Sequence, residues 1–139
     1  MPNMIYRKLS KYKYQLLNTF SYKLKRVFSC AVDVGWVKLN GDKITVKKGY
    51  CWDGASGPTV DTDNTMVPSL IHDALCQLIR VGKIDKKHQK NADLVLRDVL
   101  LDYGMTKARA YGWYYCVRLR DKFPRKTSPQ DKIYTVKAP

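Results

Sequence analysis

The most informative stretch of the sequence is residues 49–78, where a glycine-rich loop runs directly into a predicted helix. The loop reads GYCWDGASGP and carries Asp53, and the helical stretch after it contains the adjacent pair His72 and Asp73. Turn-forming residues followed by an acid-base pair on a helix are typical of a chemical site or of a tight polar clasp. We interpret the rest of the chain as the scaffold for this stretch.

Alternating apolar residues before the loop predict strands. In residues 11–24, tyrosine, leucine and phenylalanine alternate with polar residues, which predicts two strands around a turn. Residues 32–39 and 43–46 are rich in β-branched residues and flank an Asn-Gly-Asp turn at 40–42, where Asn-Gly supplies the positive φ angles of a tight hairpin. The sequence therefore predicts about four N-terminal strands.

Apolar residues after the loop recur at helical spacing. They predict a first helix over residues 68–80, with Pro68 in its first turn, and a second over residues 85–103, capped by Asp85. A third helix is expected to begin after Thr106. Each of the first two is followed by a glycine, which is a common helix stop.

Strands first and helices afterwards predict an α+β fold, in which a small antiparallel sheet packs against three C-terminal helices. A chain of 139 residues with 45% hydrophobic residues fits one domain with a buried core. We expect this domain to span residues 1–124, and residues 125–139, which have no periodicity, to form an extended basic arm.

The charge of the chain is strongly positive: 26 Lys and Arg residues stand against 12 acidic residues, giving +14. Such a charge favours a polyanionic partner, which can be nucleic acid, an anionic membrane or cell wall, or an acidic protein surface, unless it serves only as a solvated face. Basic residues gather toward both ends. The contacts with a polyanion or a neighbouring subunit are expected at Arg7, Lys8, Lys11, Lys13, Arg118, Arg120, Arg125 and Lys126.

The four cysteines, Cys30, Cys51, Cys76 and Cys116, are scattered and form no CxxC pair. We therefore expect free and mostly buried thiols, and no disulfide-linked partner. The N-terminus lacks the apolar run of a signal peptide, and no stretch approaches the roughly 20 apolar residues of a membrane span. These features predict a protein made and kept in the cytoplasm unless an assembly carries it out.

Asp93 falls on the apolar face of the second predicted helix, together with Leu96 and Leu100. A carboxylate near the core needs a partner. His72 and Arg80 on the first helix are candidates, and a hydrogen bond from Asp93 would fix the tautomer of His72, as in many acid-base sites.

Three interpretations of the loop and the helices remain open. The first is metal-assisted hydrolysis of esters or phosphodiesters, with His72 and Asp93 as the catalytic pair and Asp53 and Asp73 as ligands of a divalent cation such as calcium. The second is a structural clasp of polar side chains, and the third is an anion-binding nest in the loop. The loop residues singled out are Trp52, Gly54, Ser56 and Gly57.

Two other metal sets are weaker. His88 would complete a phosphohydrolase set, but its lysine-rich surroundings are typical of a solvated residue. His72 and Cys76 are one helical turn apart, which suits zinc, yet no further sulfur or nitrogen ligand is near in sequence.

A tyrosine- and glycine-rich loop, a His-Asp pair on a helix and a distant Asp on another helix are similar in layout to the secreted, calcium-dependent phospholipases. That similarity implies His72 as a base acting through water, Asp73 and loop carbonyls as calcium ligands, and Asp93 orienting His72. The chain lacks the dense disulfides and the signal peptide of those enzymes, so we interpret the similarity as convergence of layout.

The motifs YCWDGASGP at residues 50–58, IHDAL at 71–75 and Ala92-Asp93 resemble those of a family of small phage and prophage proteins, domain of unknown function 1353. The resemblance covers roughly residues 37–112. It implies an α+β fold and a viral setting, with no established activity. Our leading expectation is a virion-associated or assembly protein, made in the host cytoplasm, whose basic arms dock on other virion proteins or nucleic acid.

Overall fold

The computed structural model describes residues 3–10, 13–28, 30–53 and 63–121. The expected basic arm at 125–139 lies outside these residues. The described strands are β1 (Tyr6–Ser10), β2 (Lys13–Leu16), β3 (Phe20–Lys23), β4 (Ala31–Asp33), β5 (Val37–Asn40), β6 (Lys43–Val46) and β7 (Cys51–Asp53). The helices are α1 (Asp63–Arg80), α2 (Gln89–Asp102) and α3 (Lys107–Asp121), with a short 3-10 turn, η1 (Lys86–His88), before α2.

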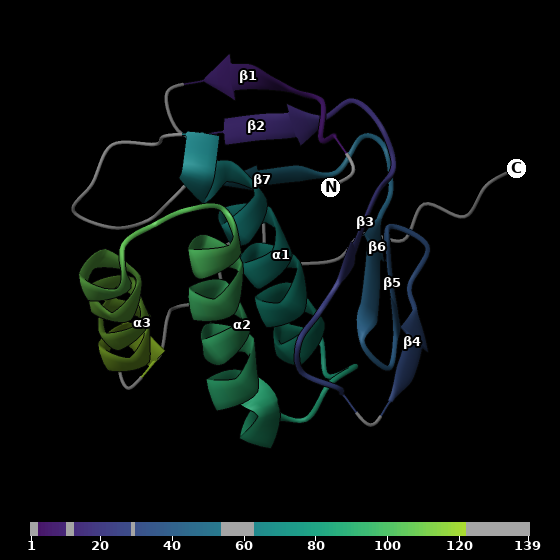
Figure 1. Cartoon of the computed structure of the whole chain (residues 1–139). Helices are drawn as coiled ribbons and strands as arrows, with labels where there is room; N and C mark the ends of the chain where they lie inside the picture. The colour runs from purple at the N-terminus through teal and green to yellow at the C-terminus, as the bar shows by residue number, and fades with distance from the viewer. Residues whose placement is uncertain (1–2, 11–12, 29, 54–62, 122–139) are drawn as a thin grey trace, which may run out of the picture.

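Strands precede helices, which confirms the predicted α+β class. The strands form two antiparallel sheets, of order β1-β2-β7 and β3-β6-β5-β4. In Figure 1, α1 lies between α2 and the four-stranded sheet, α3 lies on the far side of α2, and the three-stranded sheet crosses one end of the helices. Helix α1 is therefore the central element of the molecule.

The two strands predicted within residues 11–24 are β2 and β3, but they belong to different sheets. The segment between β2 and β3 passes from one sheet to the other, and Asn18 within it is hydrogen-bonded at both ends of its amide. Asn18 Oδ1 accepts a hydrogen bond from the backbone N–H of Ile5 at 2.8 Å, and Nδ2 donates one to the carbonyl of Asn3 at 3.0 Å. Leu16 and Phe20 on either side of this segment are both buried. The chain changes sheets while keeping both side chains in the core.

The predicted hairpin is confirmed as β5 and β6, joined by Gly41 and Asp42. Gly41 has a φ of 62°, as the first central residue of a type II′ turn requires. Asn40 was expected to share the positive φ, but it is the last residue of β5 and does not. The single strand predicted over residues 32–39 is wrong, because it breaks into β4 and β5 at Gly35, which has a φ of 90°. The amide of Gly35 donates to Asp33 Oδ1 at 2.9 Å, so a local side-chain turn replaces the ladder there.

Helix α1 begins at Asp63, earlier than the predicted start at Pro68. Proline has no backbone N–H, so inside a helix it removes one hydrogen bond, whereas in the first turn it removes none. For this reason Pro68 was expected in the first turn. Met66 and Val67, on the added turn, are 3% and 5% exposed. The burial of these apolar side chains extends the helix through the proline.

Helix α2 follows the predicted pattern. The Oδ1 of Asp85 accepts a hydrogen bond from the amide of Lys87 at 2.9 Å, and this cap opens η1, which continues into α2. Gly104, with a φ of 89°, follows the end of α2.

The main core gathers apolar residues from both sheets, α1 and α2. A second cluster joins α2 to α3 and contains Leu96, Leu100, Met105, Ala110, Trp113 and Val117. Among the described helices, none combines the length and the apolar character needed to cross a membrane. All four cysteines are free thiols, as predicted. Cys51 and Cys116 are exposed and Cys30 and Cys76 are half-buried, so the expectation of mostly buried thiols is wrong.

Candidate functional site

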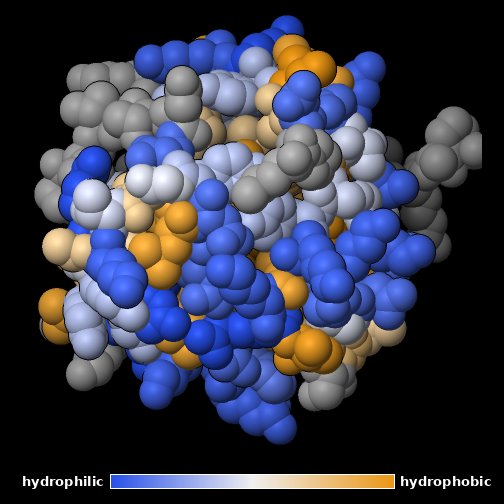
Figure 2. Space-filling view, in the orientation of Figure 1, coloured by the Kyte–Doolittle hydropathy of each residue, from blue (hydrophilic) through white to orange (hydrophobic). Residues whose placement is uncertain are grey.

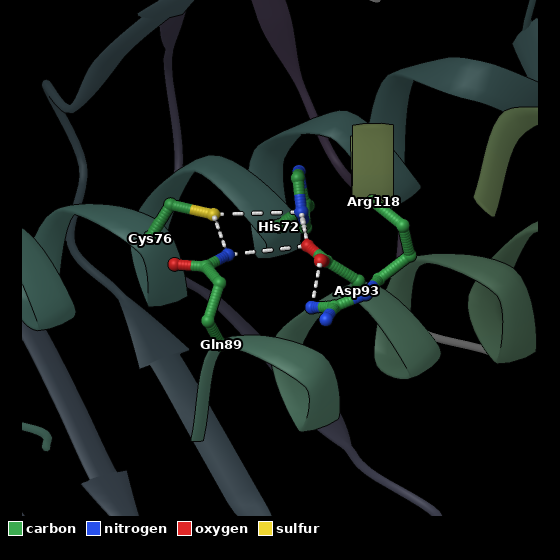
Figure 3. A network of polar contacts seen from close by, with 5 residues as sticks. All are labelled: His72, Cys76, Gln89, Asp93 and Arg118. Carbon is green, nitrogen blue, oxygen red and sulfur yellow. Dashed lines mark hydrogen bonds and ion pairs between the residues drawn. The ribbon is translucent and has the colours of Figure 1, made fainter. Parts of the chain in front are cut away.

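The site is built around a hydrogen bond between α1 and α2. His72 Nε2 of α1 lies 2.8 Å from Asp93 Oδ1 of α2 (Figure 3). The Asp93 side chain is 0% exposed and the His72 side chain is 14% exposed. The contact expected from the sequence is present, and one of its two groups is still reached by solvent.

Asp93 is an acceptor for three side chains. Its Oδ1 also accepts a hydrogen bond from Gln89 Nε2 at 3.1 Å, and its Oδ2 accepts one from Arg118 Nη1 of α3 at 3.1 Å. A buried carboxylate is tolerated when donors surround it. The contact with Arg118 is charge-assisted, and such bonds are stronger than those between neutral groups.

Cys76 lies one turn after His72 on α1, and its Sγ is 3.4 Å from His72 Nε2. Gln89 Nε2 donates to the same sulfur, also at 3.4 Å. One ligand atom from each of His72, Cys76 and Asp93 lies within 4.8 Å of the other two. The site therefore brings together one nitrogen, one sulfur and one oxygen atom of the kinds that bind metal ions.

Several groups act on the pKa of His72. Burial alone lowers it, and this effect is outweighed by the electrostatic interaction and hydrogen bond with Cys76, by the hydrogen bond to Asp93 and by the charge of Asp73. The pKa of His72 consequently lies well above its usual 6.5. The imidazole is a strong proton acceptor in this setting.

Tyr50 connects helix α1 to the start of the glycine-rich loop. Its hydroxyl donates to Gln77 Oε1 at 2.7 Å, and its ring stacks on Trp36 at a centroid distance of 5.4 Å. Burial raises the pKa of Tyr50, and the negative charges of Asp73 and Asp53 raise it further. The carboxylates of α1 and β7 thus both lie within electrostatic reach of one phenol.

The other residues predicted for the loop differ in burial, and three of them are not described by the structure. Trp52 is 4% exposed and its Nε1 donates to Ser69 Oγ at 3.1 Å, which fastens β7 to α1. Asp53 is exposed and lies opposite Lys13 in the backbone register of β7 and β2. Gly54, Ser56 and Gly57 lie outside the described residues.

Five of the eight basic residues expected to contact a polyanion are described, and one of these, Lys13, is half-buried on β2. Arg7 and Lys8 are exposed on β1, and Arg7 Nε donates to Gln15 Oε1 at 2.7 Å. Arg118 and Arg120 are half-buried on α3, where Arg118 bonds Asp93. The described part of the chain does not include Lys11, Arg125 and Lys126.

Sequence reasoning missed Gln89 as a member of the site. Its signal was present, since residues four apart on a helix share a face and Gln89 precedes Asp93 by that spacing. The role of Arg118 had no such signal, because its contact with Asp93 depends on how α3 packs against α2.

Comparison with known proteins gives a family and no characterised relative. A family model described as "Protein of unknown function (DUF1353)" matches residues 28–117. No curated protein and no solved structure matches the chain. The matched span contains His72, Cys76, Gln89 and Asp93, and it ends just before Arg118.

Proposed function

This chain belongs to the DUF1353 family, whose function is unknown, and we propose that it is a hydrolase of esters or phosphodiesters in which His72 is the general base and Asp93 positions it. The observation that carries the proposal is the 2.8 Å hydrogen bond between His72 Nε2 and Asp93 Oδ1. It joins a fully buried carboxylate to a partly exposed imidazole. A buried acceptor on Nε2 leaves Nδ1 to take a proton from water.

The proposed reaction moves one proton through His72. Nδ1 accepts it from water as the water oxygen attacks the carbonyl carbon or the phosphorus, and the imidazolium that forms is stabilised by Asp93. Arg118 and Gln89 donate to Asp93, so the carboxylate keeps its orientation. His72 then returns the proton to the departing oxygen of the substrate, which completes the hydrolysis.

The proposal extends to a divalent cation such as calcium, held by carboxylates of α1 and β7. Asp73 and Asp53 supply the hard oxygen ligands that calcium prefers, and both raise the pKa of Tyr50, which supports a shared neighbourhood. When bound, the cation would stabilise negative charge on the substrate oxygen in the transition state. Asp73 and Asp53 are the residues proposed to hold it.

The test uses p-nitrophenyl butyrate as the ester and bis-p-nitrophenyl phosphate as the phosphodiester, each with and without calcium chloride. The wild-type chain is expected to hydrolyse one of them, and His72→Gln and Asp93→Asn are expected to lower kcat/KM by about 10²–10⁴-fold. His88→Gln is the matched control, because His88 is the other histidine and packs against Phe28.

Circular dichroism establishes that each variant is folded. A folded wild-type chain that turns over neither substrate, or a folded His72→Gln variant that keeps the wild-type rate, would overturn the proposal.

A specific observation favours a second candidate, a role as a subunit of an assembly. Tyr111, Tyr115 and Leu119 of α3 are 40%, 64% and 59% exposed, and their spacing of four places them on one stripe of the helix. An exposed row of large apolar side chains is typical of a protein-protein contact. A chain of charge +14 repels a second copy of itself, so the proposed partner is another protein with an acidic rim. The viral setting that the family resemblance implies stays a proposal of the same kind.

Cys116 allows this second candidate to be tested, because it is exposed on α3 and adjacent in sequence to Tyr115. A photo-crosslinker attached to Cys116, in protein returned to its source cells, is expected to give a discrete adduct with an acidic protein. The same label on the exposed Cys51 of β7 is the control. Equal adducts from both positions, or none from Cys116, would contradict docking through α3.

A further inference from the structure

We propose that His72, Cys76 and Asp93 form a binding site for a thiophilic divalent metal ion, with zinc as the natural occupant. The three residues supply the nitrogen, sulfur and oxygen ligands that zinc takes in proteins. Within the described residues they are the group of three whose ligand atoms converge, all lying within 4.8 Å of one another. This site is distinct from the proposed calcium position at Asp73 and Asp53, since calcium takes oxygen ligands and disfavours thiolates.

The distances suit a tetrahedral ion. Bond lengths of about 2.0–2.3 Å from zinc place its nitrogen, sulfur and oxygen ligands roughly 3.3–3.6 Å apart. The separation of Cys76 Sγ from His72 Nε2 is 3.4 Å, so these two atoms already match. Asp93 Oδ1 is closer to Nε2, at 2.8 Å, because a hydrogen bond now joins them. Replacing that proton by an ion opens the pair by roughly 0.5 Å.

The surrounding donors orient both anionic ligands. Arg118 holds Asp93 Oδ2, which leaves Oδ1 as the oxygen facing His72 and Cys76. Gln89 Nε2 donates to Cys76 Sγ and to Asp93 Oδ1, as Figure 3 shows. Hydrogen bonds of this kind fix the ligands of protein metal sites.

The fourth position of such an ion would be open. The His72 side chain is 14% exposed and that of Arg118 is 30% exposed, so solvent reaches the edge of the site. Three protein ligands plus water is the arrangement of zinc sites that are not purely structural. The geometry therefore points to an ion with an exchangeable water.

Zinc and the His72–Asp93 hydrogen bond exclude each other, because the ion takes the Nε2 and Oδ1 atoms that share the proton. Bound zinc would thus inhibit the hydrolysis proposed above, and this consequence alone rests on the proposed function. The binding itself does not depend on any activity of the chain.

Cobalt(II) is the probe, because a tetrahedral cobalt-thiolate centre absorbs in the near ultraviolet and the visible. The full chain is purified with a chelator, transferred to chelator-free buffer and titrated with cobalt chloride. We expect one cobalt ion per chain, a thiolate-to-cobalt band, and loss of that band when zinc chloride is added. Gln89→Ala is expected to weaken cobalt binding by about 10–100-fold, since it removes a donor to two ligands.

Single cysteine variants provide matched controls. Cys76→Ser is expected to abolish the thiolate band, whereas Cys51→Ser and Cys116→Ser keep it, because both of these thiols are exposed and away from His72 in sequence. Circular dichroism of the metal-free variants shows that each is folded, and Cys76→Ala serves as a second variant if Cys76→Ser does not fold.

Two outcomes would overturn the site: a wild-type chain without the thiolate band, or a band that persists in Cys76→Ser. The readout is a spectrum and needs no substrate. Failure of the hydrolase proposal therefore leaves this result intact, and an absent cobalt band leaves the hydrolase test intact.

Discussion

Asp93 is the residue at which the three helices meet. Its carboxylate has no exposure and accepts hydrogen bonds from His72 of α1, Gln89 of its own helix and Arg118 of α3. A buried charge with this many donors is stable only as a set, because each donor is left unsatisfied when the acceptor is removed.

Asp93→Ala is therefore expected to lower the free energy of unfolding by about 3–5 kcal/mol. Urea denaturation followed by tryptophan fluorescence measures the change. Asp98→Ala is the control on the same helix: Asp98 pairs with Arg26 at 3.0 Å and Arg97 at 3.4 Å, but all three side chains are partly exposed, so a loss of about 1 kcal/mol is expected. Equal losses in the two variants would show that Asp93 does not join the helices.

His72 makes the stability of the fold depend on pH, and the sign of this dependence follows from the raised pKa of His72. The unfolded state releases the proton near pH 6.5, and the folded state holds it to higher pH. The contribution of His72 to stability is fully present below pH 6.5 and is lost as the pH rises through the folded pKa. The proposed hydrolysis, which needs the neutral imidazole, should speed up over the same rise.

An NMR titration of the His72 imidazole tests this dependence. It is carried out on a His88→Gln chain with a chelator present, so that one histidine remains and no metal binds. The midpoint is expected above 6.5, and Asp93→Asn is expected to lower it, because the hydrogen bond to Asp93 raises the pKa. A midpoint at or below 6.5 in the His88→Gln chain would contradict the assignment.

The sequence was informative about the residue pair His72 and Asp93 because an acid on an apolar helix face must find a partner. It was not informative about Arg118, which was expected to contact a polyanion. The bond from Arg118 to Asp93 exists because α3 packs on α2, and no local pattern encodes that packing.

Local chemistry explains which elements could be predicted. The β5–β6 hairpin and the Asp85 cap depend on residues adjacent in sequence, and both were predicted correctly. The break between β4 and β5 was missed because residues 32–39 look like one continuous strand. In the structure the Asp33 side chain accepts the hydrogen bond of the Gly35 amide, which replaces a bond between strands. The start of α1 was missed because burial of its first turns, a tertiary effect, outweighs the local preference of Pro68.

Two glycines in different elements are expected to respond oppositely to alanine. Gly41 has a φ of 62° in the β5–β6 turn, where alanine is strained even though nothing lies within 4 Å of its added Cβ. Gly112 is inside α3, where an added Cβ also meets nothing within 4 Å. Gly41→Ala should lower the free energy of unfolding by about 1 kcal/mol and Gly112→Ala should raise it by about 0.5–1 kcal/mol. Urea midpoints measure both, and changes of the same sign would contradict these backbone assignments.

The whole chain carries far more positive than negative charge. Figure 2 shows a face on which hydrophilic residues predominate over α2 and hydrophobic residues lie in separate patches. Two surface ion pairs, Lys25–Asp102 at 2.8 Å and Arg26–Asp98 at 3.0 Å, offset only a small part of the repulsion expected from a net charge of +14.

Salt is accordingly expected to stabilise the fold. Raising sodium chloride from about 0.01 M to about 0.15 M shortens the Debye length from about 30 Å to about 8 Å, which screens repulsion across the molecule more than contacts at 3 Å. A gain of about 1 kcal/mol would raise the Tm by about 4 °C in a chain of this size. Thermal unfolding followed by circular dichroism measures the shift.

A charge-reduced variant separates screening of repulsion from other effects of salt. Lys8, Lys47 and Lys48 are exposed, and replacing all three by glutamate changes the net charge from +14 by −6 to +8. The salt-induced rise in Tm should shrink in this variant, since less repulsion remains to be screened. A wild-type Tm that falls as salt is added would mean that the surface ion pairs outweigh the net charge, and the positive surface would then not limit the stability of the fold.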